Sequence, residues 1–247
     1  MRTYLIASLV GGLLLTAGAR AEDEAKAVIA KAIKAHGGEE ALTKFQAGQT
    51  RAKGKIELLG GLEFTQQSSF MLPDKLKETV DMEVMGQQVR VVSIVNGTKL
   101  SIEANGQEVP VEDKVKDMLK DAGYAMKVSR LVPLVKEKGF ELAPLGEVKV
   151  NDKPAVGVRV SSKGEKDISL FFDKETGLLA KVERRAVDPM AGNEITEERI
   201  ITEYTKTDGV PTPKKVTVNH DGNKYMEVEI LETKRLEKLE DSEFAKP

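Results

Sequence analysis

The segment ISLFFDKETGLLAKVE, residues 168–183, places a turn between two runs in which apolar and other side chains alternate. Successive side chains of a β-strand point to opposite faces, so Ile168, Leu170 and Phe172 are expected to share one face of a sheet. Phe171 is then expected on the other face. The segment predicts a strand with one buried face. If the protein's own core covers that face, the segment says little about function; if a cavity lies against it, the protein is a carrier or a binding protein.

The connection 173–177 has the composition of a short hairpin loop and contains Gly177, a residue suited to positive φ. The alternation then resumes, which places Ala180 and Val182 on the same face as Phe172. One β-bulge would reverse this parity.

The same period of two recurs along most of the chain. Asn96-Gly97 lies between two such runs and is expected to be a turn, although Asn96-Gly97-Thr98 also matches a glycosylation acceptor. We expect twelve strands, near 49–59, 62–72, 75–84, 88–95, 98–104, 141–150, 154–162, 166–173, 177–187, 194–206, 214–220 and 224–236.

Two regions have helical periodicity instead. Residues 22–36 form an amphipathic helix that ends at Gly37-Gly38, and 39–45 can add a short helical turn. Residues 111–138 predict two amphipathic helices separated around Gly123, and Pro133 should kink or shorten the second.

No low-complexity linker and no internal repeat divides the chain, which predicts a single domain over 22–247. Twelve strands exceed what a strongly twisted open sheet usually holds, so the sheet should curve into a barrel or part of one. The expected fold is mainly β with α: an antiparallel, unclosed β-barrel (half-barrel) whose concave face is covered by the helices.

Residues 1–21 have the pattern of a signal peptide, with Arg2 before an apolar run and Ala19-Arg20-Ala21 as the cleavage site. The alternative is a membrane anchor, but the apolar run is shorter than the ~20 residues that a span needs. Cleavage after Ala21 predicts a periplasmic or secreted protein.

Composition excludes several classes of function. The mature chain would carry 36 basic and 40 acidic residues, which disfavours nucleic acid as a partner, and the absence of cysteine excludes disulfides and thiol nucleophiles. His36 and His220 are expected to be structural residues at a helix end and a turn. We therefore expect no enzyme, no cofactor and no metal site. The charged run from Glu232 to Glu243 is expected to form solvated strand edges and a tail.

Several weak motifs combine into a resemblance. They are Leu72-Pro73-Asp74-Lys75-Leu76 before a strand, Val95-Asn96-Gly97-Thr98-Lys99-Leu100, the hairpin opening at Phe172-Asp173, and the closing Phe244-Ala245-Lys246-Pro247. In this order the chain resembles the LolA/LolB-like outer-membrane lipoprotein-sorting family. The resemblance implies a half-barrel whose apolar concave face accepts lipoprotein acyl chains beneath helices.

The sequence departs from that family at two positions. Leu72 stands where the carrier typically has an arginine that latches its helical lid, and Ser101 stands where it favours tryptophan. These departures bear on the carrier mechanism and leave the expected fold unchanged.

The resulting hypothesis is a monomeric binding protein that holds a lipid or lipoprotein acyl chain, with envelope membrane proteins as further partners. Two alternatives stay open: the same apolar residues form a permanently closed core, or the chain is a ligand-free interaction or envelope-sensing module. The expected lining residues are Phe64, Phe70, Met82, Val91, Val115, Met118, Leu119, Val128, Leu131, Val132, Val135, Ile168, Leu170, Phe172, Val182, Val218, Val228 and Ile230.

Overall fold

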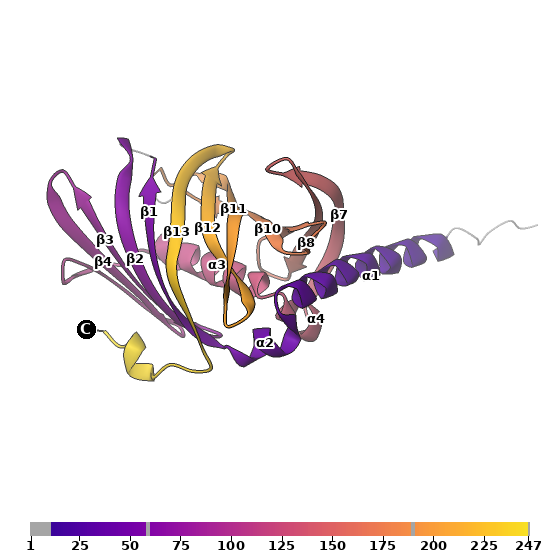
Figure 1. The fold of residues 1–247 in the computed structure, drawn as a ribbon, viewed down its shortest axis with the longest axis horizontal. Coiled ribbons are helices and arrows are strands. Elements are labelled where there is room, and N and C mark those ends of the chain that lie inside the picture. Colours follow the sequence, from indigo (N-terminus) through magenta and orange to yellow (C-terminus); the bar gives the residue numbers. More distant parts are fainter. Residues whose placement is uncertain (1–10, 58–59, 189–190, 247) are drawn as a thin grey trace, which may run out of the picture.

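The computed structural model describes residues 11–57, 60–188 and 191–246 (Figure 1). Its helices are α1 (Gly11–Ala35), α2 (Gly38–Lys44), α3 (Asp113–Ser129), α4 (Val132–Lys136) and the 3-10 helix η2 (Asp241–Phe244). Its strands are β1 (Ala47–Ile56), β2 (Leu62–Met71), β3 (Lys75–Val84), β4 (Gln87–Asn96), β5 (Lys99–Ala104), β6 (Gln107–Val109), β7 (Phe140–Val150), β8 (Lys153–Ser162), β9 (Ile168–Asp173), β10 (Leu179–Val187), β11 (Glu194–Thr207), β12 (Val210–His220) and β13 (Asn223–Leu236).

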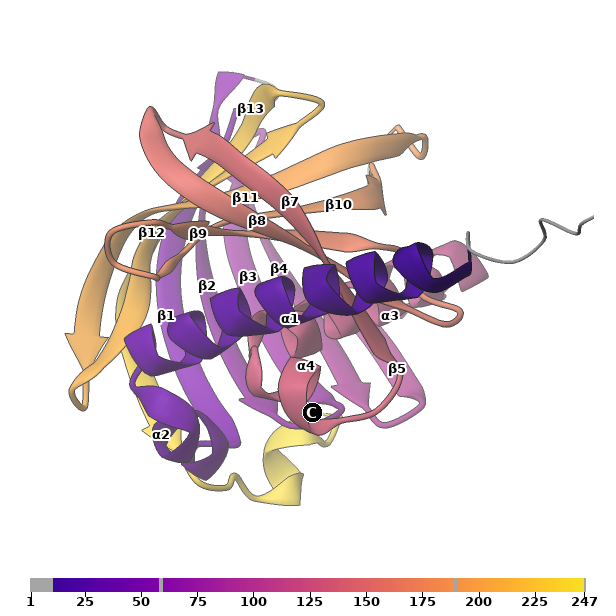
Figure 2. The ribbon, with the colours of Figure 1, turned by 90° about the vertical axis from the view of Figure 1, so that its right-hand side faces the viewer.

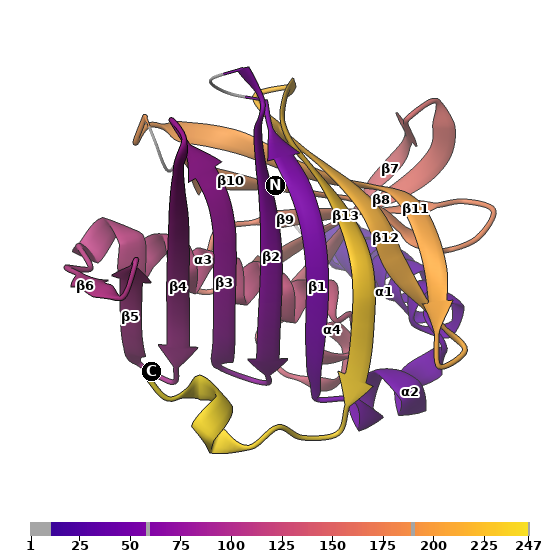
Figure 3. The ribbon, with the colours of Figure 1, turned by 60° about the vertical axis from the view of Figure 1, so that its left-hand side comes forward.

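All these strands belong to one antiparallel sheet, in the order β6-β5-β4-β3-β2-β1-β13-β12-β11-β10-β9-β8-β7. Two meanders, β1 to β6 and β7 to β13, are joined side by side where β1 pairs with β13 (Figure 3). The sheet curves without closing, because β6 and β7 are its two free edges. The predicted half-barrel is confirmed. One strand was missed: the three-residue β6, which follows the turn at Asn105-Gly106.

The topology explains why helices cover the concave face. The chain leaves the first meander at one edge, β6, and enters the second at the opposite edge, β7. The connecting segment must therefore cross the sheet. Figure 2 shows α1, α3 and α4 together on one side, with β1 to β5 behind them.

The helical core lies over the second meander. In α1, Ala25, Ile29 and Ala32 are completely buried at helical spacing, and this stripe packs against α4, β7 and β8. The helix predicted over 22–36 is present and is followed by Gly37-Gly38, but it starts earlier, at Gly11. Of the expected signal peptide, residues 1–10 lie outside the described residues.

The segment 111–138 differs from its prediction. α3 continues through Gly123 as one helix, and the break comes at Leu131, whose φ is 65° and ψ is −47°. The Val132 N–H donates to the Arg130 carbonyl over 2.7 Å, which closes a three-residue γ-turn around Leu131. Pro133 lies in the first turn of α4, where its missing N–H costs nothing.

The hairpin of residues 168–183 contains the bulge that reverses parity. Leu179 pairs with Phe172 and Lys181 with Phe171, so Ala180 is the extra residue. Leu179 therefore packs in the concave core, whereas Ala180 packs with Phe171 on the outer face. The expectation that Ala180 faces the concave side was wrong, and that for Val182 was right.

Candidate functional site

The concave face has a closed half and an accessible half. On β9 and β10 its residues are buried together with the α3–α4 junction in one cluster, which includes Val128, Leu131, Val132, Ile168, Leu170, Phe172 and Val182. On β3 and β4 the residues of the same face are only half-buried. Residues paired across neighbouring strands point to the same face of the sheet. The concave face can therefore be followed from β10 to β1 through the pairs Val182–Arg199, Arg199–Val218, Val218–Met226 and Met226–Ile56.

The accessible half brings together the other strand residues named as lining. Phe64 and Val218 are buried, and five more are half-buried on the same face: Phe70, Met82, Val91, Val228 and Ile230. From the helices, Val115, Met118 and Leu119 of α3 are half-buried, while Val135 of α4 keeps 38% of its surface exposed. Strands β2, β3, β4 and β13 thus supply apolar side chains to one face that solvent still reaches.

Two glycines of β1 shape this surface. A Cβ on Gly54 would overlap Cζ of Phe64, and a Cβ on Gly48 would lie 2.7 Å from Cε1 of Phe70. Each phenylalanine of β2 therefore lays its ring directly over a glycine of the neighbouring strand. Glycine is needed because any side chain would displace the ring.

A polar row crosses the apolar surface. Thr50, Ser68 and Glu78 lie opposite one another on β1, β2 and β3, and the hydroxyls of Thr50 and Ser68 are 2.5 Å apart. Gln66 Nε2 donates to Glu78 Oε1 over 2.7 Å. Desolvation raises the pKa of Glu78, and the charge of Arg199 opposes the rise. The Glu78 side chain is half-buried, yet its carboxyl group is strongly desolvated, as expected for a carboxyl that lies in a recess of the surface.

Two arginines meet at the end of this face nearest α2. Arg235 follows Thr233 on the concave side of β13 and pairs with Gly48. Arg130, at the end of α3, places its guanidinium 5.6 Å from the centroid of the Phe70 ring. Burial lowers the pKa of Arg130 to about 10, with a further contribution from the charge of Arg235.

His36 is a neighbour of this arginine pair at the end of α1. Its Nδ1 lies 2.8 Å from the Ala32 carbonyl, and the Leu179 N–H points to its Nε2 over 3.4 Å. The neutral ring protonated at Nδ1 satisfies both contacts. Desolvation lowers the pKa of His36, and Arg235 lowers it further. His36 is thus a structural residue that ties α1 to β10, as its position at a helix end predicts.

Sequence reasoning did not identify Glu78 or the arginine pair. Glu78 follows from the alternation of 75–84, which places it on the face of Met82. Arg235 was assigned to a solvated strand edge, but β13 is an interior strand between β1 and β12. Directly after that run, Phe244 is 1% exposed and packs near Lys75 on the outer face.

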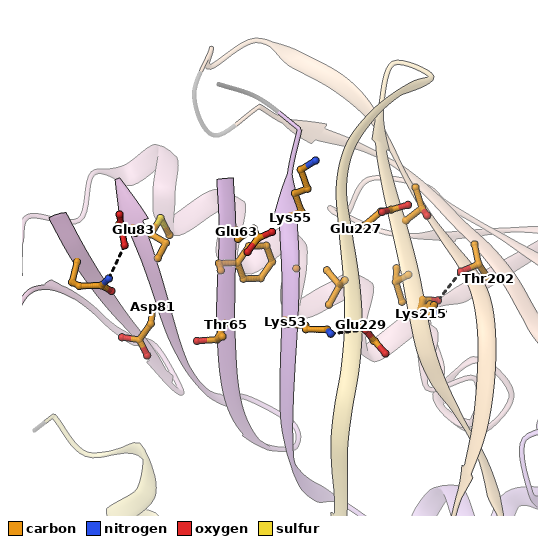
Figure 4. Close-up of a pocket in the computed structure, with 17 residues that line it drawn as sticks. Lys53, Lys55, Glu63, Thr65, Asp81, Glu83, Thr202, Lys215, Glu227 and Glu229 are labelled. Atoms are coloured by element: carbon orange, nitrogen blue, oxygen red, sulfur yellow. Dashed lines mark hydrogen bonds and ion pairs between the residues drawn. The ribbon is translucent and has the colours of Figure 1, made fainter. Parts of the chain in front are cut away.

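The outer face carries a groove of about 760 Å³ that crosses the strands (Figure 4). Two rows of outward side chains form its walls, and the backbone of the intervening row, at Gly54 and Phe64, forms its floor. The walls are mostly charged. Lys53 pairs with Glu229 over 3.1 Å, so the charges largely neutralise one another. Phe64, Met82 and Val228 also line the groove, but its charged walls differ from the apolar lining expected for an acyl chain.

Phe171 explains the apolar triplet of residues 170–172. It is 6% exposed and packs on the outer face with Val150 and Ala155. A Cβ on Gly157 would lie 2.9 Å from its ring, and Lys181 Nζ lies 4.5 Å from the ring centroid. The strand thus buries both faces: one under the helices, the other under this small cluster.

Among the described residues, no group of three or more His, Asp or Glu side chains could hold a metal ion. None of the helices, over the part of the chain that the structure describes, is long and apolar enough to cross a membrane.

The sequence matches no protein-family model and no curated protein. Solved structures do match. A LolA superfamily protein from Nitrosomonas europaea superposes with a TM-score of 0.56 at 10% identity, and a DUF1329 family protein from Desulfovibrio piger with 0.55 at 12%. A putative outer membrane lipoprotein-sorting protein domain from Vibrio parahaemolyticus gives 0.52 at 9%. Each match covers 90% of this chain and 97% of the other. The chain therefore has the LolA-like fold, in a divergent form.

Proposed function

We propose that this protein is a non-enzymatic carrier that holds an acyl chain of a lipid or lipoprotein on the accessible half of the concave face. The observation that carries the proposal is the contrast between the two halves of that face. The part of the face on β7 to β10 is buried under helices, whereas Met82, Val91 and Val228 on the same face are only half-buried. A contiguous apolar surface of this kind is typical of a binding site.

The magnitudes favour an exchangeable helix. An acyl chain of about sixteen carbons contributes ~0.8 kcal/mol per buried CH₂, or roughly 13 kcal/mol gross. On α3 the half-buried apolar side chains are Val115, Met118 and Leu119. Their present burial contributes roughly 2–5 kcal/mol in total, and complete burial would contribute about twice that free energy. A bound chain can therefore replace the contacts that α3 makes with the sheet.

The fold supports the same assignment. One structural neighbour is described as an outer membrane lipoprotein-sorting protein domain. The signal-like segment 1–21 would deliver the mature chain, residues 22–247, to the periplasm or the outside after cleavage following Ala21. There an acyl carrier would meet lipoproteins and envelope membrane proteins.

Adjacent valines of β4 give a matched test. Val91 faces the concave side opposite Val80, whereas Val92 faces outward opposite Thr79, and both are half-buried. We expect Val91→Glu to weaken the binding of a neutral probe, pyrene-labelled hexadecanol, at least about tenfold, because a carboxylate would lie against the chain. Val92→Glu should stay within about twofold of the parent protein, since it adds charge to the solvated face.

Both variants are first compared by thermal unfolding, so that a loss of fold is not mistaken for a loss of binding. Native mass spectrometry of protein purified from its host's envelope should also show a bound lipid. The proposal fails if the parent protein neither carries lipid nor binds the probe, which is the outcome for a ligand-free interaction module. Equal losses in the two valine variants would move the site away from the concave face.

A further inference from the structure

We propose that Arg130 and Arg235 form a headgroup subsite, which takes the carboxylate or phosphate of an anionic amphiphile. This inference rests on the proposed function, because the acyl chain of the same molecule would lie on the apolar face beside it. The subsite sets the class of ligand: a single-headed anionic lipid in preference to a neutral one.

The two guanidinium groups converge from different parts of the chain. Arg235 projects from β13 next to Gly48, and the ring of Phe70 covers that glycine. Arg130 then lies over the same ring, from the end of α3. The missing side chain at Gly48 lets the ring lie flat, and the ring in turn supports Arg130 from below.

Neither arginine has a carboxylate within 4.0 Å among the residues that the structure describes. Arg130 Nη2 donates to the Phe45 carbonyl over 2.6 Å. Arg235 Nη2 donates to Thr212 Oγ1 over 3.0 Å and lies 3.4 Å from the Pro211 carbonyl. Its Nε is buried without a hydrogen-bond partner in this structure. A guanidinium offers five donors, so several remain for a ligand.

Another largely buried arginine of the same sheet, Arg184, has an acidic partner within the protein. Arg184 donates to Glu197 over 2.9 Å, and the two side chains are 12% and 13% exposed. Burying a cation is costly unless an anion accompanies it. The arginine pair has no such ion pair: the charge of Asp208 acts on Arg235, but no described carboxylate lies within 4.0 Å of either guanidinium, and the pair lies at the edge of an accessible apolar surface. An anionic headgroup would supply the missing charge.

Backbone strain adds an independent observation. Leu131, the residue after Arg130, is 1% exposed and is held in a γ-turn with positive φ. This conformation is rare for a residue with a side chain, and such strain is concentrated at functional positions. Here the turn ends α3 directly after Arg130 and fixes the point from which its guanidinium leaves the helix.

The direction of the bound molecule follows from the register. Beyond Arg235 the face continues through Thr233, Thr50 and Ser68, whose hydroxyls can bond a headgroup oxygen. Apart from Gln66, the next rows are apolar and include Ile230, Val91 and Met82. The headgroup would therefore lie near α2 and the acyl chain would run along the strands toward Gly54. Glu78 borders the hydroxyl row, but its carboxyl is engaged by Gln66.

The test compares four ligands: hexadecanoate, hexadecyl phosphate, hexadecanol and inorganic phosphate. Each competes with the neutral pyrene probe on the mature chain or, for inorganic phosphate, is titrated by calorimetry. The parent protein should bind both anionic amphiphiles at least tenfold more tightly than hexadecanol. Arg130→Gln and Arg235→Gln should each reduce that preference to threefold or less and leave hexadecanol binding unchanged.

Arg51→Gln is the matched control, because Arg51 lies on the outer face of β1 and pairs with Glu232 over 3.3 Å. It should retain the full preference. Arg235→Lys keeps the charge without the planar fork and should retain part of it, which separates charge from simple loss of packing. If one glutamine variant fails to fold, the other gives the same comparison.

The inference is overturned if the parent protein binds the three amphiphiles equally, or if the arginine variants lose all of them in parallel. Inorganic phosphate binding as tightly as hexadecyl phosphate would also overturn it, because the site would then serve a free anion. These results differ from failure of the proposed function, in which hexadecanol itself does not bind to the parent protein.

Discussion

The γ-turn at Leu131 gives the sharpest test of the structure. Two substitutions, Leu131→Ala and Leu131→Gly, remove nearly the same buried side chain but differ in the cost of positive φ. Leu134 is the control, since it is 3% exposed, lies three residues away and has helical backbone in α4. The comparison therefore isolates the backbone of Leu131 from its packing.

The magnitudes can be worked out for both positions. Truncating a buried leucine to alanine costs about 2–5 kcal/mol of unfolding free energy, and we take about 3 kcal/mol at each site. In the helix, Leu134→Gly should cost about 1 kcal/mol more than Leu134→Ala. At Leu131 the alanine variant keeps the strained backbone, which costs about 1–3 kcal/mol of unfolding free energy. The glycine variant avoids most of that cost, because glycine adopts positive φ readily. Leu131→Gly should therefore be about 1 kcal/mol more stable than Leu131→Ala.

The assay is urea unfolding of the mature chain followed by far-ultraviolet circular dichroism, with the free energy obtained by linear extrapolation. The decisive quantity is the order of the glycine and alanine variants at each position. A glycine penalty at Leu131 equal to that at Leu134 would refute the argument, because it would mean that Leu131 has an ordinary helical backbone.

Two further predictions concern stability. Glu78→Gln keeps an acceptor for Gln66 and removes a desolvated charge. Because folding raises the pKa of Glu78 above its usual value of 4.5, the variant should be more stable than the parent at about pH 7. The gain should disappear at about pH 4, and urea unfolding at both pH values measures it. An unchanged difference between the two pH values would contradict it. Gly54→Ala should lower the unfolding free energy by about 1–3 kcal/mol, because its Cβ meets the Phe64 ring, whereas Gly123→Ala, with open space in α3, should raise it by about 0.5–1 kcal/mol. A Gly54→Ala variant as stable as the parent would show that the ring does not lie over that glycine.

Alternation was a sufficient signal for the walls of the candidate site. Each strand residue named as lining lies on the concave face, because a period of two determines which residues share a face within an uninterrupted strand. The bulge at Ala180 was not predictable in the same way, because nothing in Leu178-Leu179-Ala180 distinguishes a bulged residue from a regular one. Only pairing with Phe172 settles which of them faces inward.

The helix break and the arginine pair were missed for different reasons. Gly123 was expected to interrupt α3 because glycine has low helix propensity, but tertiary packing overrides a cost of only about 1 kcal/mol. Arg235 was assigned to a solvated edge because it lies in a charged run. Its partial burial depends on β13 pairing with β1, a contact between segments far apart in the sequence that no local pattern encodes.

The two unpaired edges have a mechanical consequence. In a closed barrel, strand number and stagger fix the diameter, so capacity changes only if a ladder of hydrogen bonds breaks. Here β6 and β7 share no ladder, so a change in twist would separate them with every ladder intact, and the covalent connection between them, residues 110–139, would limit how far. For the proposed carrier, such a movement would let one sheet accept ligands of different width, and the bend at Leu131 would be the natural point at which that connection lengthens.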